Sequence, residues 1–292
     1  MTMTALSYGR LHAGLIGILC LAGAATAAFA DGDRVVSLGG SVTEIAVALG
    51  AEGRLVARDT TSNFPASVEA LPDVGYIRAL SPEGVLALDP DLILAEGDAG
   101  PPEAVEVLKS AGIPFHLVPE ATTPEGLVDK IHAVAQVLGL GPQGKALADQ
   151  VAAGLAEARA KAAALPETDR KRVLFVLSLQ GGRILAGGEG TEAEGIITLA
   201  GGVNAGTGFQ GYKQMTDEAV IAAAPDVILM MDREGDLAIA DADLFGHPAI
   251  AQTPAGAAQR VVRMDGMLML GFGPRTPQAA ATLYDAFYPA GG

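Results

Sequence analysis

Residues 81–94 read SPEGVLALDPDLIL, and residues 216–229 read TDEAVIAAAPDVIL. The second stretch repeats the first without insertion, and a Gly-Tyr pair precedes each copy, at Gly75-Tyr76 and Gly211-Tyr212. Each copy predicts a short helix followed by a buried strand. One strand-helix unit cannot bury its own apolar face, so the repeat predicts two similar α/β halves that pack together.

Strands and helices alternate on both sides of the repeat. Short apolar runs predict strands at 35–38, 91–95, 115–118, 171–177 and 227–231. Helical spacing and capping residues predict helices at 43–49, 81–88, 101–111, 124–138, 143–165 and 193–202. Glycine pairs at 39–40 and 181–182 follow the first strand of each half and are expected to turn the chain into the next helix. This alternation is typical of parallel βαβ units with right-handed crossovers.

The longest uninterrupted helical pattern runs from Gln143 to Leu165 and contains no internal proline. It lies between the two halves and is expected to join them. The sequence therefore predicts an α/β protein of two similar Rossmann-like lobes with parallel sheets, joined by one long backbone helix. The predicted division is an N-terminal lobe at 31–140, a linking helix at 141–168 and a C-terminal lobe at 169–292.

The first thirty residues have the pattern of a cleavable signal peptide. Arg10 precedes the apolar stretch Leu11–Ala25, and Ala28-Phe29-Ala30 forms an A-x-A cleavage site. Cys20, the single cysteine, lies in this stretch behind Leu19, whereas a lipoprotein signal needs a small residue there. The sequence predicts export to the periplasm and a mature chain without a disulfide or a thiolate metal site.

Charge and hydropathy exclude some partners. The formal net charge is −15, which argues against nucleic acid or an anionic membrane surface as a partner. No apolar run after the signal peptide approaches the ~20 residues that cross a bilayer, so no direct membrane insertion is expected.

Ligands of open α/β sheets bind beyond the carboxyl ends of the strands. Two lobes of this kind should face each other across a cleft, bordered by the loops 38–41, 74–81, 96–100, 178–184, 209–216 and 231–236. Tyr76 and Arg78 are the most notable polar pair in these loops. A guanidinium favours the anionic phenolate, a hard ligand for Fe(III), and tyrosine is one known axial ligand of haem iron. Spacing alone leaves open that Tyr76 packs beneath the loop while Arg78 pairs with a carboxylate.

Four segments carry a resemblance to a known family: RVVSLGGSVTEI (34–45), GYIRALSPEG (75–84), GYK (211–213) and LGFGPR (270–275). They resemble the periplasmic haem-binding proteins of bacterial ABC haem importers, and the resemblance covers essentially all of 34–289. These proteins belong to the helical-backbone class of solute-binding proteins, whose other members bind ferric siderophores or cobalamin.

The resemblance implies that Tyr76 is the axial ligand of ferric haem b and that Arg78 stabilises its oxygen. It also places Arg233 on the opposite lobe, facing the haem propionates. Lys213 and Tyr212 are further candidates in the same cleft. A solvated Arg233 and a Tyr212 packed against its lobe are the structural alternatives.

A second protein ligand is not expected from the loop 178–182, where some family members carry a histidine and this chain has Leu179-Gln180. The histidines after the signal peptide are His116, His132 and His247, and no two have metal-ligand spacing. A clustered zinc or manganese site is therefore not predicted. His247 is kept as a remote haem-ligand candidate.

Glu83 and Glu218 occupy matching positions in the two copies of the repeat, each at a helix start. An acidic side chain there stabilises a helix by about 0.3–1 kcal/mol, which is one explanation. The resemblance implies another, in which these residues dock onto arginines of the ABC permease dimer. Equivalent surfaces on two lobes suit a two-fold partner.

The predicted function is a monomeric periplasmic shuttle that captures haem and delivers it to an inner-membrane ABC haem permease, without catalysis. A ferric siderophore or cobalamin is the alternative ligand within the same fold. A nucleotide-using α/β enzyme is a third possibility, supported only by the glycines at 187–190 and 271–273. Neither segment completes a G-x-G-x-x-G or P-loop motif, and no Ser-His-Asp constellation is evident.

Overall fold

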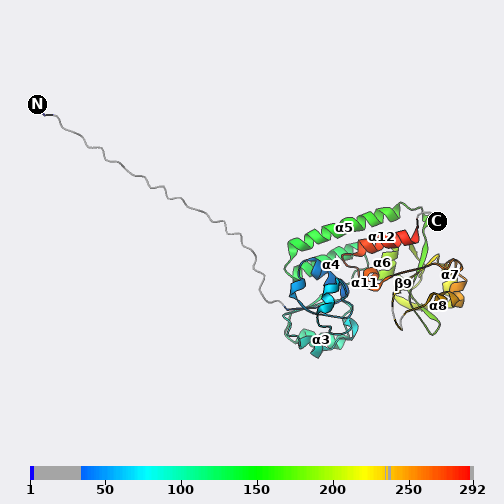
Figure 1. Ribbon diagram of the computed structural model, residues 1–292, viewed down its shortest axis with the longest axis horizontal. Helices are drawn as coiled ribbons and strands as arrows, with labels where there is room; N and C mark the ends of the chain where they lie inside the picture. The colour runs from blue at the N-terminus through cyan, green and yellow to red at the C-terminus, as the bar shows by residue number, and fades with distance from the viewer. Residues whose placement is uncertain (3–33, 234, 236–237, 290–292) are drawn as a thin grey trace. The chain divides into compact units, whose positions relative to one another are not determined.

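The computed structural model describes residues 1–2, 34–233, 235 and 238–289 (Figure 1). Nearly all of the predicted signal peptide, 1–30, lies outside the described residues. The described chain from Arg34 onward forms one compact unit. Within this described part, no helix is both long enough and apolar enough to cross a membrane.

The first sheet is entirely parallel and has the strand order β2-β1-β3-β4. Its central strands β1 and β3 are buried almost along their whole length, as expected for a parallel sheet covered on both faces. The strands are β1 (Val35–Leu38), β2 (Leu55–Arg58), β3 (Leu92–Glu96) and β4 (Phe115–Val118). The helices of this half are α1 (Gly40–Ala48), α2 (Pro82–Leu86), α3 (Pro102–Ser110) and α4 (Pro124–Val137), with 3-10 helices η1 (Glu52–Arg54), η2 (Ala66–Ala70) and η3 (Ile77–Ala79).

The second sheet has the order β10-β9-β5-β6-β8, with β7 paired to β5. The strands are β5 (Arg172–Gln180), β6 (Arg183–Gly187), β7 (Val203–Asn204), β8 (Tyr212–Met215), β9 (Val227–Asp232) and β10 (Val261–Asp265). The helices of this half are η4 (Glu167–Asp169), α6 (Glu192–Leu199), α7 (Asp217–Ala223), α8 (Asp241–Gly246), α9 (Pro248–Ala251), α10 (Pro254–Ala257), α11 (Gly266–Leu270) and α12 (Thr276–Phe287).

The predicted α/β class is confirmed, but the prediction of a parallel second sheet is wrong at β6 and β8. Both strands pair antiparallel, β6 with β5 and β8 with β6. The cause is the glycine pair Gly181 and Gly182, whose φ angles are 60° and 72°. Two consecutive positive φ angles make the tight turn that matches the twist of a β-hairpin. The chain therefore folds back as β6 here instead of entering a helix directly.

The long linking helix is confirmed as α5 (Gly141–Ala163). Figure 1 shows α5 and α12 side by side, and α5 also contacts α4 and α6. One apolar core runs from the first half through α5 into the second, and it includes Leu127, Val151, Phe175 and Leu283. A shared core should resist independent movement of the lobes. The lobe boundaries at 140 and 169 stay predictions.

Candidate functional site

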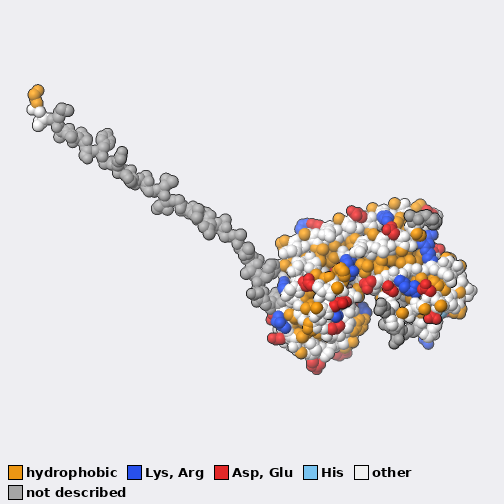
Figure 2. Space-filling model, in the orientation of Figure 1, with side chains coloured by type: hydrophobic (Ala, Val, Ile, Leu, Met, Phe, Trp, Pro, Cys, Tyr) orange, Lys and Arg blue, Asp and Glu red, His pale blue; other side chains and the backbone are white. Residues whose placement is uncertain are grey.

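A cavity of about 620 Å³ is lined by residues of both halves. Its volume lies in the range of about 300–1,000 Å³ that small-molecule sites occupy. In Figure 2 the surface is hollowed between the two halves, with acidic and basic side chains beside the hollow. The apolar lining includes Ile77, Leu177, Leu185, Met231, Met267 and Leu270. The charged lining is Arg78, Glu96, Asp98, Glu120, Lys130, Glu192 and Arg233.

Tyr76 and Arg78 come together on one wall of this cavity. Tyr76 is the residue before η3 and is 42% exposed. Arg78 Nη1 donates to Tyr76 Oη at 2.9 Å, and Arg78 Nη2 forms an ion pair with Asp98 Oδ2. The alternative of a Tyr76 ring packed beneath the loop does not match this exposure, although Arg78 does pair with a carboxylate. The wall thus presents a phenol oxygen that already accepts from a cation.

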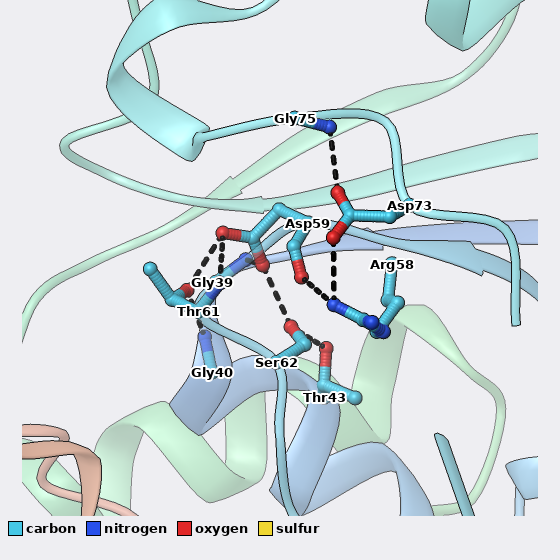
Figure 3. A network of polar contacts seen from close by, with 9 residues as sticks. All are labelled: Gly39, Gly40, Thr43, Arg58, Asp59, Thr61, Ser62, Asp73 and Gly75. Atoms are coloured by element: carbon cyan, nitrogen blue, oxygen red, sulfur yellow. Dashed lines mark hydrogen bonds and ion pairs between the residues drawn. The ribbon is translucent and has the colours of Figure 1, made fainter. Parts of the chain in front are cut away.

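The loop before Tyr76 is tied to β2 by Asp73 (Figure 3). Asp73 Oδ1 accepts from Gly75 N at 2.8 Å, and Asp73 Oδ2 accepts from Arg58 Nη1 at 3.0 Å. Gly75 has a φ of 94°, in the region that favours glycine. The backbone directly before Tyr76 is therefore anchored to the first sheet.

Asp59 is the buried centre of the same network (Figure 3). Its carboxylate accepts from the backbone N–H groups of Gly39 and Thr61, both at 2.9 Å. It also accepts from Thr61 Oγ1 and Ser62 Oγ, both at 2.7 Å. Thr61 itself lines the cavity. This one carboxylate therefore joins the end of β1 to a loop of the cavity wall.

Tyr212 lies on the second half's wall and donates from Oη to Glu192 Oε2 at 3.0 Å. Burial raises the pKa of Tyr212 above its ordinary value, and the negative charge of Glu192 raises it further. Tyr212 is therefore a neutral phenol in this arrangement and not an anionic ligand. Lys213 is exposed and is not among the lining residues, because neighbouring residues of a strand point to opposite faces. Arg233, just after β9, does line the cavity.

The buried cation Lys130 and its partner Glu96 form another part of the lining, and no pattern in the sequence indicated their pairing. Lys130 is 3% exposed, and its Nζ donates to Ser41 Oγ and to Glu96 Oε1, both at 2.9 Å. Ser41 Oγ also donates to Glu96 Oε1. Lys130 lies on the apolar face of α4, beside Leu127 and Ile131. A lysine on the apolar face of a predicted helix was the signal that the sequence offered, because a lysine is rarely buried unless it has a charged partner.

Acidic side chains crowd one side of the cavity. Desolvation raises the pKa of the Glu120 carboxyl, and the negative charges of Asp98, Glu192 and Glu96 raise it further. The sequence predicted the loop 96–100 at the cleft, but no motif indicated that these carboxylates lie close together. Their charge should disfavour anionic parts of a ligand on this side.

The three described histidines, His116, His132 and His247, are not among the residues that line the cavity. His247 is buried, with Nε2 at 3.0 Å from Gly182 O, and its Nδ1 accepts from Ala249 N at 3.2 Å. It therefore caps α9. His116 and His132 are exposed. Among the residues that the structure describes, no group of three His, Cys, Asp or Glu side chains is placed to hold a metal ion.

Glu83 and Glu218 are both exposed in the first turns of α2 and α7. Ser81 caps α2 by accepting from the N–H of Gly84, and Thr216 caps α7 in the same way. A hydrogen bond from its own backbone N–H and one from Thr216 lower the pKa of Glu218. The two acids thus have equivalent local settings. Docking by them stays a prediction.

The chain is similar to known binding proteins. A sequence profile of the periplasmic binding protein family matches residues 35–268. The structure of the periplasmic heme-binding protein BhuT in complex with two hemes is 42% identical, with a TM-score of 0.82, over 87% of this chain and 97% of that one. The apo periplasmic heme-binding protein RhuT from Roseiflexus sp. RS-1 is 37% identical, with a TM-score of 0.83, over 88% and 98%. A vitamin B12-binding protein of Vibrio campbellii is 31% identical, over 69% of this chain and 72% of its own length.

Proposed function

Because this chain belongs to the periplasmic binding protein family, we propose that it captures ferric haem b in the cavity between its halves. It delivers the haem to an inner-membrane ABC permease after export through a signal peptide at 1–30, and it acts as a monomer. The observation that carries the proposal is the exposed Tyr76 phenol, whose oxygen accepts from Arg78 inside that cavity. The similarity to solved heme-binding proteins supports the same ligand.

The cavity residues fit haem by their chemistry. Tyr76 would supply an oxygen ligand for iron, and the Arg78 guanidinium donates a hydrogen bond to that oxygen. Leu177, Leu185 and Met267 offer apolar contact to a porphyrin. Arg233 lines the cavity from the second half and provides a cation for a propionate.

Cobalamin is the second candidate, because one relative is a vitamin B12-binding protein. Cobalamin and ferric siderophores arrive with the metal's coordination largely filled, so neither needs a phenolate from the protein. The Tyr76 and Arg78 arrangement therefore favours haem. The relatives are solute-binding proteins, and the proposed function includes no chemical change of the ligand.

Hemin titration of the purified protein tests the proposal. We expect a saturable shift of the Soret band and a high-spin ferric electron paramagnetic resonance signal of the tyrosinate type. Cyanocobalamin and a ferric siderophore, titrated in the same way, serve as comparison ligands. Saturable binding of cyanocobalamin with no hemin response would contradict the proposal and favour the second candidate.

Reversal of charge at both Glu83 and Glu218 is expected to reduce haem transfer to the permease at least about tenfold, because two ion pairs with the permease would become repulsive. Each single change should have a smaller effect. Transport by the permease reconstituted in liposomes is the measurement, with hemin affinity measured in parallel and expected to stay unchanged.

Glu103→Lys is the matched control, because Glu103 is an exposed acid in the first turn of α3. It should transfer haem like the parent. Normal transfer by the Glu83→Lys, Glu218→Lys double variant would rule out this docking surface.

A further inference from the structure

One guanidinium bridges two groups in the cavity wall. Arg78 Nη1 donates to Tyr76 Oη, while Arg78 Nη2 pairs with Asp98 Oδ2. The Arg78 side chain is 59% exposed, whereas that of Asp98 is only 20% exposed. The Asp98 carboxylate, which is more buried, is therefore the less mobile partner of this ion pair.

The backbone places Asp98 independently of its own side chain. Gly100 N donates to Ile77 O at 2.9 Å, and Leu80 N donates to Gly100 O at 2.8 Å. These bonds join the loop that carries Asp98 to the loop that carries Tyr76 and Arg78. Truncation of the Asp98 side chain should therefore leave the position of Tyr76 intact.

The ion pair with Arg78 is the polar contact that explains the position of the Asp98 carboxylate. Asp98 Oδ1 is buried and has no hydrogen-bond partner within the described part of the chain. The charge of Asp98 also helps to raise the pKa of the nearby Glu120 carboxyl, so these two acids repel when both are ionised. A carboxylate in this position needs a cation, and Arg78 provides it.

Arg78 in turn needs an anchor. An arginine has several rotatable bonds, and a mostly exposed side chain loses conformational entropy when one contact orders it. Burial lowers the pKa of Arg78, but the charge of Asp98 and the contact with Tyr76 raise it overall, so the guanidinium stays charged. A second contact at Nη2 restricts the side chain so that Nη1 stays on the phenol oxygen.

We propose that Asp98 is the positioning residue that holds Arg78 on the Tyr76 oxygen and thereby stabilises the negative charge of that oxygen when it is bound to haem iron. The inference rests on the proposed function, since it concerns the same ligand. Asp98 acts through Arg78 and does not itself contact iron. Its orienting effect outweighs the partial neutralisation of Arg78 by its negative charge.

Resonance Raman spectra of the hemin complex test this role, because the iron–phenolate stretching frequency reports bond strength. Asp98→Ala is expected to shift this frequency in the direction that Arg78→Ala does and to speed haem dissociation roughly 3- to 10-fold. Asp98→Asn should recover at least half of the change, because an amide oxygen can still accept from Nη2. In the Arg78→Ala background, Asp98→Ala should add nothing.

Glu125→Ala is the matched control, because Glu125 forms a carboxylate–guanidinium pair with Arg159 and does not line the cavity. It should leave the frequency unchanged. Parent-like spectra and dissociation for Asp98→Ala would overturn the inference. So would an additive effect in the Arg78→Ala background, or an Asp98→Asn variant that behaves like the alanine variant.

A ligand-free measurement separates this inference from the proposed function. If the parent shows no Tyr76-dependent hemin spectrum, the proposed function fails. Whether Asp98 restricts the Arg78 side chain is then tested by ¹⁵N relaxation of the Arg78 Nε–H group in the protein without ligand. This group should be ordered in the parent and mobile in Asp98→Ala, and equal mobility in both would show that Asp98 does not hold Arg78.

Discussion

Tyr76→Phe is expected to abolish the phenolate-to-iron charge-transfer band of the hemin complex and to weaken hemin binding at least about 100-fold. The change removes one oxygen and keeps the ring, so it tests ligation and not packing. Substitution of a residue that hydrogen-bonds to a metal ligand typically reduces metal affinity about 10- to 100-fold. Loss of the ligand itself should reduce hemin affinity by at least as much. Absorbance titration and competition with a haem acceptor protein provide the measurements.

Two other tyrosines serve as comparisons for this variant. Tyr212→Phe removes a phenol in the same cavity that donates to Glu192, and it should retain the charge-transfer band. Tyr284 lies on α12, outside that cavity, so Tyr284→Phe should have the charge-transfer band and the hemin affinity of the parent. A parent-like band in Tyr76→Phe together with its loss in Tyr212→Phe would show that the ligand had been assigned to the wrong wall.

Asp59→Ala is expected to lower the free energy of unfolding by about 3–5 kcal/mol. Asp59 is fully buried and accepts hydrogen bonds from Gly39, Thr61 and Ser62. Its removal leaves their N–H and O–H groups buried without this acceptor, and each such group costs about 1–3 kcal/mol, not fully additively. Urea unfolding followed by circular dichroism measures the change.

Asp59→Asn should lose less stability, because its amide oxygen can still accept two of these hydrogen bonds. The control is Asp149→Ala, which removes an exposed pair with Lys145 on α5 and should change stability by no more than about 0.5 kcal/mol. Unfolding of Asp59→Ala within about 1 kcal/mol of the parent would contradict a central role for this carboxylate.

The fold was predictable where its determinants are local. β1 and β3 are mainly apolar because a parallel sheet buries both of their faces. α5 was evident from a long helical pattern without internal proline. The hairpin between β5 and β6 was missed, because a glycine pair can precede either a helix or an antiparallel strand. Strand pairing decides between them, and pairing is not a local property.

The candidate site divides in the same way. Tyr76 and Arg78 could be paired from the sequence because they are two residues apart in one loop. Asp98, Lys130 and Glu192 come from separate parts of the chain, and no periodic pattern relates them to that pair. The loop of Asp98 was expected at the cleft, but its pairing with Arg78 and the presence of Lys130 and Glu192 became evident only from the folded chain.

The amino-acid sequence alone determined two α/β halves, the long helix between them and the loop that carries the phenol and the guanidinium. These features follow from hydrophobic periodicity, helix caps and residue spacing, which act over a few residues. Only the tertiary structure decided that the second sheet is mixed and that Asp98 pairs with Arg78. Both depend on segments brought together by packing of the shared core, where burial and the pairing of charges select among many possible partners.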